Sequence, residues 1–221
     1  MTAKISSIFT SIATALAVLT GAIAVPLLLR PFYAWHIGPL HLERVLGMGR
    51  SEILTAYDDV MDYCLGLRSD FSAGTLPYSD SGAAHFADVR FLFLLDLSVL
   101  AISLVVLAGL ALWRKKADFQ NYRFCSHSPG FWSACGLGTV FLLIGLLSTI
   151  DFRRSFTTFH TVFFHGKSNW IFHVDTDPII LLLPQDYFRN CALLILGTLL
   201  LLCGLLVWWD FRENKKRRHR A

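Results

Sequence analysis

Four long apolar segments constrain this chain more than any other feature. They cover residues 5–29, 91–113, 131–150 and 191–209, and only the second contains a charged side chain, Asp96. At about 1.5 Å per residue, a helix of roughly 20 residues crosses the roughly 30 Å hydrocarbon core of a bilayer. The sequence therefore predicts an all-α integral membrane protein with four transmembrane helices, organised as a single membrane domain over residues 1–221.

The composition excludes several other classes of protein. Hydrophobic residues make up 54% of the chain and charged residues 16%, and the mean hydropathy is +0.52. A soluble domain has about 25% charged residues and cannot bury this much apolar surface. An ordinary cytosolic enzyme, a disordered chain and a collagen-like chain are therefore excluded. The first apolar segment is longer than the roughly 7–15 residues of a signal-peptide core, so we expect it to remain as a helix.

The distribution of Lys and Arg predicts how the chain crosses the membrane. Eleven basic residues lie in short segments on one side, namely the N-terminus, the loop 114–130 and the tail 210–221, and nine are spread over the longer segments 30–90 and 151–190. Positive residues in short segments favour the cytoplasmic side. We therefore expect both termini in the cytoplasm and the two longer segments as a small extracytoplasmic cap. The basic tail then anchors the topology at anionic lipid, and we expect no nucleic-acid binding.

The two outer segments have different patterns. Residues 51–65 carry apolar side chains at helical spacing, with Ser51 as a candidate N-cap and Gly66 as a candidate end, which predicts an amphipathic helix. The segment 151–190 is rich in Phe and Trp, which suit the headgroup level of a bilayer. We expect that segment to lie along the membrane interface.

Two histidines in the outer segments are candidates for proton transfer. His85 stands three residues before Asp88, ahead of the second span, and the two share a face if a helix begins there. His160 is a polar residue in an otherwise apolar, aromatic run. Histidine can take and return a proton near neutral pH without a cofactor. Structural readings stay open as well, with the histidines as satisfied packing residues, Asp88 as a charge at a helix start and Asp177 as a turn or cap residue.

Three strings of the sequence resemble a known family. They are YDDVMDYCL at residues 57–65, LPYSDSGAAHFADVR at 76–90 and FHTVFFHGKSNWIFHVDTDPIILLLPQDYF at 159–188. They are similar to the family of small integral membrane proteins that includes the bacterial lipoprotein intramolecular transacylase. The resemblance implies an enzyme of the bacterial plasma membrane with its active site on the extracytoplasmic face. Such enzymes move the sn-2 acyl chain of an S-diacylglyceryl lipoprotein cysteine onto its α-amino group and produce a lyso-form lipoprotein.

The resemblance also implies residue roles. His85 and His160 match the family's functional histidines and are the expected general acid and base, in an order left open. Asp88 is an expected orienting group, and Asp177 fits the family string as a supporting residue. The transfer from ester to amide runs downhill, so no cofactor or metal is expected, and the sequence contains no P-loop or GxGxxG motif. The expected partners are the diacylglyceryl lipoprotein and membrane lipid in the outer leaflet.

The acyl chains of such a substrate need apolar room that opens sideways to the outer leaflet. We expect a cavity between the spans near their outer ends, lined by Phe91, Leu92, Leu95 and the aromatic residues from Phe159 to Phe172. The residues expected to contact the substrate there are Phe91, Leu95, Phe159 and Trp170.

Two other functions are compatible with the same residues. A metal-dependent membrane hydrolase would use ligands such as His85, Asp88, His160 and His165, although their spacing matches no HExxH-like signature. A non-enzymatic membrane assembly or lipid-binding protein would use the outer segments as an interaction surface. Replacement of His85 and His160 separates these readings, because the non-enzymatic protein would tolerate it.

Overall fold

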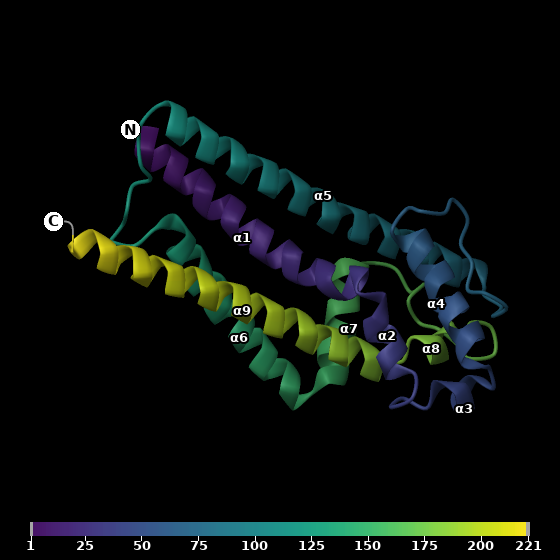
Figure 1. Ribbon diagram of the computed structural model, residues 1–221. Helices are drawn as coiled ribbons and strands as arrows, with labels where there is room; N and C mark the ends of the chain where they lie inside the picture. Colours follow the sequence, from purple (N-terminus) through teal and green to yellow (C-terminus); the bar gives the residue numbers. More distant parts are fainter. Residues whose placement is uncertain (1, 220–221) are drawn as a thin grey trace. The chain divides into compact units, whose positions relative to one another are not determined.

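The computed structural model describes residues 2–219, which form nine helices and no strand (Figure 1). The helices are α1 (Thr2–Leu28), α2 (Arg30–His36), α3 (Leu42–Leu46), α4 (Arg50–Cys64), α5 (Asp80–Lys116), α6 (Pro129–Ile150), α7 (Phe152–Phe163), α8 (Ile179–Leu182) and α9 (Gln185–Arg218). Arg220 of the predicted basic tail lies outside the described residues. The chain divides into two compact units, of which unit 1 takes residues 2–25, 96–146 and 195–219, and unit 2 takes residues 26–95 and 147–194. The all-α prediction is confirmed.

Four helices, α1, α5, α6 and α9, are long and apolar enough to cross a membrane. They correspond to the four apolar segments of the sequence, but α5 and α9 are longer than those segments. Helix α5 begins at Asp80, well before Phe91, and α9 continues to Arg218. Hydropathy marks the part of a helix that suits lipid, whereas the helix itself ends where its backbone hydrogen bonds stop.

In unit 1 the long helices pack through small and apolar side chains. Ala22 of α1, Ala134 of α6 and Leu199 of α9 are buried in one cluster, together with Val18 and Cys203. Small side chains let helices approach closely in a membrane, where lipid removes most of the hydrophobic driving force between helices. Close packing therefore stabilises this unit.

A buried carboxylate of α9, Asp210, joins α9 to the loop before α6. Asp210 is 2% exposed. It accepts hydrogen bonds from Arg123 Nη2 (2.6 Å), His127 Nδ1 (2.6 Å), the Ser128 backbone N–H (2.9 Å) and Asn214 Nδ2 (3.2 Å). These four donors offset the cost of removing a carboxylate from water. We call these five residues the Asp210 cluster.

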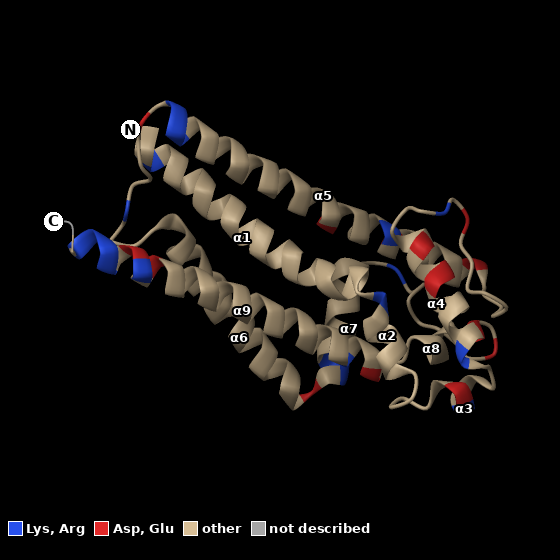
Figure 2. Cartoon of the chain, in the orientation of Figure 1, with Lys and Arg blue, Asp and Glu red and all other residues tan. Residues whose placement is uncertain are grey.

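Charged side chains occupy different places in each unit (Figure 2). In unit 1, Lys and Arg gather in the last turns of α5 and α9. In unit 2, helix α4 carries three aspartates that pair with arginines. Arg30 pairs with Asp58 and Asp62, and Arg68 pairs with Asp59.

The core of unit 2 is aromatic. Tyr33 of α2 stacks on Tyr57 of α4 with ring centroids 3.8 Å apart, and its hydroxyl donates to the Leu182 carbonyl of α8 at 2.9 Å. The Tyr57 hydroxyl lies 3.2 Å from the Tyr187 hydroxyl. The rings bury apolar area while the hydrogen bonds satisfy the hydroxyls. The same core includes Phe86 of α5, which directly follows His85.

Helix α4 confirms the predicted amphipathic helix but corrects its start. It spans Arg50–Cys64, so the N-cap residue is Gly49, and Ser51 lies inside the first turn. The Glu52 carboxylate accepts a hydrogen bond from the Gly49 backbone N–H at 2.8 Å, which satisfies a free donor at the helix start without a serine cap. The predicted end is confirmed, because Gly66 follows the helix with a φ of 77°.

The segment 151–190 contains an amphipathic helix, α7, that was not predicted from the sequence. Asp151 is its N-cap and accepts a hydrogen bond from the Arg154 backbone N–H at 3.0 Å. Phe156 and His160 stand one turn apart on one face, and polar residues occupy the other. The placement of this segment along a membrane interface stays a prediction.

Candidate functional site

The start of α5 is held by the turn before α8. The Ser79 hydroxyl accepts a hydrogen bond from the Gly82 backbone N–H at 3.0 Å, as an N-cap side chain does. Asp177, which is 4% exposed, accepts from the Ser79 backbone N–H at 2.8 Å and from the Ser79 and Thr176 hydroxyls at 2.9 and 2.7 Å. A Cβ at position 82 would collide with Asp177 Oδ1, so a larger residue there would displace this carboxylate from its contacts with Ser79. This junction fixes the first turn of α5, directly before His85.

The carboxylate of Asp177 is ionised at this junction. Burial acts to raise the pKa of Asp177, but the hydrogen bonds from Ser79 and Thr176 outweigh it and hold the pKa below its ordinary value. A carboxylate next to a helix N-terminus is also favoured by the helix dipole. Asp177 therefore stabilises the position of α5 at neutral pH.

His85 is enclosed by aromatic rings of unit 2. It is 5% exposed, and its ring centroid lies 4.7 Å from that of Phe164 and 5.4 Å from that of Phe172, both edge-on. Its Nδ1 is buried and has no hydrogen-bond partner within residues 2–219. A buried polar atom without a partner is costly and calls for an explanation, of which a missing ligand is one.

His160 of α7 has a defined tautomer. Its Nδ1 lies 2.8 Å from the Phe156 carbonyl, which only accepts, so Nδ1 carries the proton and Nε2 holds the free lone pair. The rings of Phe156 and Trp170 lie 4.2 and 5.0 Å from it between centroids. Burial lowers the pKa of His160 below its ordinary value, although the hydrogen bond to Phe156 opposes this shift. The imidazole is therefore neutral at pH 7 and available as a base.

Unit 2 brings the two predicted histidines together. The ring centroids of His85 and His160 are 6.0 Å apart, with an angle of 29° between the ring planes. Phe164 touches both rings, at 4.7 and 5.5 Å between centroids. A neutral imidazole with a free lone pair beside a second imidazole, inside an aromatic enclosure, can move a proton between two groups of a bound substrate.

Asp88 lies near the histidines but its carboxylate is occupied by other partners. It accepts hydrogen bonds from Lys167 Nζ at 2.6 Å and from Asn169 Nδ2 at 3.0 Å. These contacts tie the segment after α7 to α5. That segment contains Trp170, so Asp88 fixes one wall of the aromatic enclosure.

The residues expected to contact the acyl chains lie in unit 2, mostly at its surface. Phe91, Leu95 and Phe159 are exposed, and Trp170 is half-buried beside His160. The Trp170 indole donates to the Lys167 carbonyl at 3.1 Å. An apolar cavity formed by these residues stays a prediction.

Phe164 and Phe172 belong to the aromatic run that was expected to line the cavity, and both contact His85. Lys167 and Asn169 were not identified from the sequence. They reach the site through loop geometry, for which the sequence carries no local signal. His165 and His173 are exposed.

No group of three or more His, Cys, Asp or Glu side chains within residues 2–219 is arranged to hold a metal ion. Cys64 is buried in the core of unit 2, and burial raises the pKa of its thiol to about 12. Such a thiol remains protonated and is a poor nucleophile.

Solved structures share this fold. The in meso structure of the membrane integral lipoprotein intramolecular transacylase Lit from Bacillus cereus superposes with a TM-score of 0.81 at 20% identity, covering 98% of this chain and 97% of that chain. A histidine-to-arginine variant of that protein superposes with a TM-score of 0.80 at 21% identity, covering 98% and 94% of the two chains. These likenesses establish an all-helical, membrane-integral fold.

Sequence comparison identifies the family. An uncharacterized protein of Aquifex aeolicus (strain VF5) is 28% identical over 144 residues, which are 65% of this chain and 60% of that relative's length. The model of the family described as lipoprotein intramolecular transacylase Lit matches residues 8–188, which include both histidines, Asp88 and Asp177. The chain therefore belongs to the lipoprotein intramolecular transacylase Lit family.

Proposed function

We propose that this protein is an intramolecular transacylase. It moves the sn-2 acyl chain of an S-diacylglyceryl-cysteine lipoprotein onto the α-amino group of the same cysteine. The observation that carries the proposal is the pair of neighbouring imidazoles, His85 and His160, with ring centroids 6.0 Å apart inside an aromatic enclosure. Family membership supports the reaction class, and the imidazoles supply the proton transfer that this reaction requires.

The proposed location is the bacterial plasma membrane, with one membrane domain crossing it four times. Both termini and the basic ends of α5 and α9 are cytoplasmic, in agreement with the positive-inside rule. The segments 30–90 and 151–190 form an extracytoplasmic cap, so the histidines work at the outer leaflet. The diacylglyceryl lipoprotein is itself anchored in that leaflet and enters sideways.

The reaction exchanges an ester for an amide within one molecule. The α-amine attacks the sn-2 ester carbonyl carbon, a C–N bond forms, and the bond from that carbon to the glyceryl oxygen breaks. The nitrogen loses a proton and the glyceryl oxygen gains one, so the products are an amide and a free sn-2 hydroxyl. The reacting atoms close a ring of about eight members, so holding the amine against the ester is a large part of the catalysis.

The two histidines take different parts in this scheme. His160 accepts the amine proton at Nε2 and returns it to the departing glyceryl oxygen, because its Nδ1 is already used by the Phe156 carbonyl. His85 remains neutral and donates its N–H to the oxyanion of the tetrahedral intermediate. Asp177 and Asp88 act as positioning residues, through the start of α5 and through the segment after α7.

The acyl chains are proposed to lie against the exposed apolar side chains near the histidines. Phe91 and Leu95 of α5, Phe159 of α7 and Trp170 are the contacts. Exposed apolar side chains at this level are shielded by lipid when the site is empty and by the substrate's acyl chains when it is filled.

The test is expression in a bacterial host that lacks lipoprotein N-acylation. Mass spectrometry of lipopeptide N-termini should then detect N-acyl, S-monoacylglyceryl cysteine. The double variant His85→Gln, His160→Gln should accumulate unmodified diacylglyceryl lipoprotein while remaining folded in the membrane. Formation of lyso-form lipoprotein at the wild-type level by that variant would refute the proposed chemistry.

A further inference from the structure

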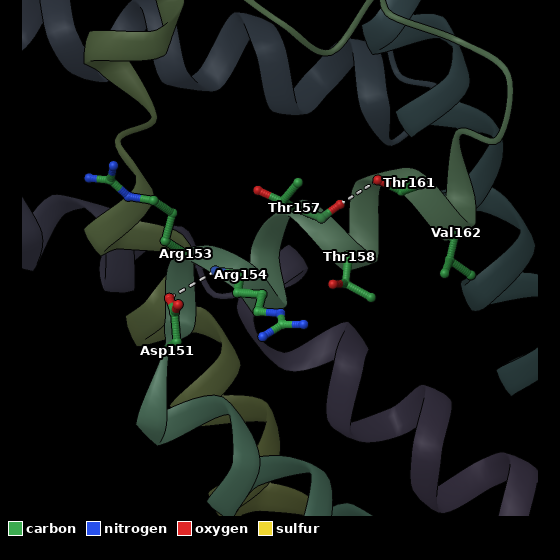
Figure 3. Close-up of a pocket in the computed structure, with 7 residues that line it drawn as sticks. All are labelled: Asp151, Arg153, Arg154, Thr157, Thr158, Thr161 and Val162. Atoms are coloured by element: carbon green, nitrogen blue, oxygen red, sulfur yellow. Dashed lines mark hydrogen bonds between the residues drawn. The ribbon is translucent and has the colours of Figure 1, made fainter.

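The polar side chains of α7 border a shallow, open pocket of about 570 Å³. The lining residues are Asp151, Arg153, Arg154, Thr157, Thr158, Thr161 and Val162. Arg154 and Thr158 stand one turn apart and extend to the same side of the helix, and Arg153 points away from them (Figure 3). Arg154 and Thr158 lie on a different side of α7 from His160, whereas Arg153 stands two turns before His160 on nearly the same side.

The two arginines on this face form no ion pair in the part of the chain that the structure describes, although the N-cap carboxylate of Asp151 lines the same face. Neither Arg153 nor Arg154 takes part in the salt bridges of residues 2–219. Arg189 of the same unit, by contrast, pairs with Asp186 at 3.0 Å. The Thr161 hydroxyl donates to the Thr157 carbonyl at 2.9 Å, whereas the Thr158 hydroxyl makes no hydrogen bond within the described residues. Two guanidinium groups and a free hydroxyl are thus available to an external ligand.

Without a bound anion, the position of these two arginines is electrostatically unfavourable. They occupy the first turn of α7, where the helix dipole disfavours positive charge by about 0.3–1 kcal/mol per residue. They also follow directly after α6, on the proposed extracytoplasmic side, where the positive-inside rule disfavours Lys and Arg. An anion bound to them would offset both costs.

We propose that this face of α7 binds the phosphate group of an anionic phospholipid. Arg154 and Thr158 are the main contacts, and Arg153 supplies a second cation from the adjacent side. Guanidinium groups bind phosphate oxygens through charge-assisted hydrogen bonds, and a hydroxyl one turn further along the helix can donate a third. A headgroup is the fitting source, because the opposite face of α7 exposes Phe159 and Phe163, which suit the acyl region of the same leaflet.

Occupancy of this site acts on the helix that carries His160. An anion on the polar face and lipid on the aromatic face together hold α7 at the membrane surface. If the proposed transacylation is correct, anionic lipid therefore stabilises the position of the catalytic base. The binding itself does not depend on the reaction.

Hydrogen–deuterium exchange of the full-length protein in nanodiscs tests the binding. Discs of phosphatidylcholine alone are compared with discs that also contain phosphatidylglycerol. We expect the α7 amides to exchange about fivefold more slowly with phosphatidylglycerol, the effect of one arginine near an anionic surface. Arg154→Gln should abolish the difference, whereas the matched control Arg189→Gln should keep it. Unchanged exchange of the α4 amides in Arg154→Gln verifies that unit 2 is folded.

Several outcomes would overturn the proposal. One is equal α7 exchange in both kinds of disc, and another is loss of the difference in Arg189→Gln as well. Protection by inorganic phosphate in phosphatidylcholine discs, without an effect of phosphatidylglycerol, would identify free phosphate as the ligand. Protection only by an acidic diacylglyceryl lipopeptide would make this face a peptide site. Because the readout is exchange and not turnover, an inactive transacylase would leave these results unchanged.

Discussion

Each unit contains a histidine with defined partners, and the two units use the imidazole differently. In unit 1, His127 Nδ1 bonds to the Asp210 carboxylate at 2.6 Å, and its ring stacks on Phe131 with centroids 3.9 Å apart. In unit 2, His85 and His160 are surrounded by aromatic rings, and no carboxylate within residues 2–219 forms a salt bridge with either. A histidine that satisfies a buried carboxylate stabilises a fold, whereas one with an unused nitrogen is available to a ligand.

The sharpest test of this comparison replaces the histidines one at a time. We expect His85→Gln and His160→Gln each to lower the rate of N-acylation by about 10²–10⁴-fold, the usual contribution of a positioned acid or base. His127→Gln should retain the wild-type rate and lower only the resistance to unfolding. Mass-spectrometric initial rates in nanodiscs measure the first effect, and titration with denaturing detergent measures the second. A rate loss in His127→Gln equal to that of the other two would remove the distinction between the units.

The pH dependence of the N-acylation rate should also differ between a catalytic base with a lowered pKa and a histidine with an ordinary pKa. Because burial disfavours the imidazolium form, the pKa of His160 lies below the ordinary value of about 6.5. The neutral base is therefore present at pH 7 and is lost only as the pH falls through that lowered pKa, with a rate decrease of about tenfold per pH unit below it. NMR of histidine-labelled protein, with His160→Gln to assign the signal, should give a midpoint below 6.5. A midpoint above 6.5 would contradict the expected neutral base.

The Asp210 cluster should show a stability effect without a catalytic one. Asp210→Asn leaves Arg123 and His127 without their anion, and we expect a loss of about 1–3 kcal/mol of unfolding free energy. Asp118→Asn, at an exposed loop position of the same unit, is the matched control and should be neutral. Detergent titration of both variants measures this difference. Equal stability of the two variants would show that the cluster is dispensable.

The smallest effect on the N-acylation rate is expected from breaking the contact between Asp88 and Lys167. This ion pair is half-exposed on the lysine side, and such pairs contribute about 0.2–1 kcal/mol. Asp88→Asn and Lys167→Gln should each reduce the N-acylation rate by less than about tenfold, and the double variant should be no worse than the more affected single one. A loss in Asp88→Asn as large as that in His85→Gln would instead make Asp88 part of the proton-transfer machinery.

The sequence predicted those parts of the fold that depend on local pattern. The apolar segments predicted four long helices, and the spacing in residues 51–65 predicted α4. Burial of one side of a helix requires apolar residues at regular spacing, so the pattern recurs in every turn. The exact ends were less predictable. At the start of α4, the Glu52 carboxylate accepts a hydrogen bond from the Gly49 backbone N–H. A rule based on serine N-caps does not predict this start.

The site was only partly predictable, since it joins residues far apart in the chain. His85 and His160 stood out because each is a polar side chain in an apolar context, but their proximity is a tertiary fact. The link of Asp177 to Ser79 is likewise invisible to local rules, because 98 residues separate the partners. Helix α7 was not predicted, because its aromatic residues are equally typical of a segment lying along a membrane interface.

The hydrogen bond from His160 to the carbonyl four residues earlier determines the net charge of the histidine pair. The helix backbone orients the ring without contributing a charge, whereas a carboxylate partner would bring one into an apolar setting. The resting pair is then uncharged, and positive charge appears only when the His160 ring takes the proton that the attacking amine loses as the C–N bond forms. That charge remains between aromatic faces until the departing glyceryl oxygen takes the proton, so acyl transfer proceeds with little rearrangement of the surrounding dielectric.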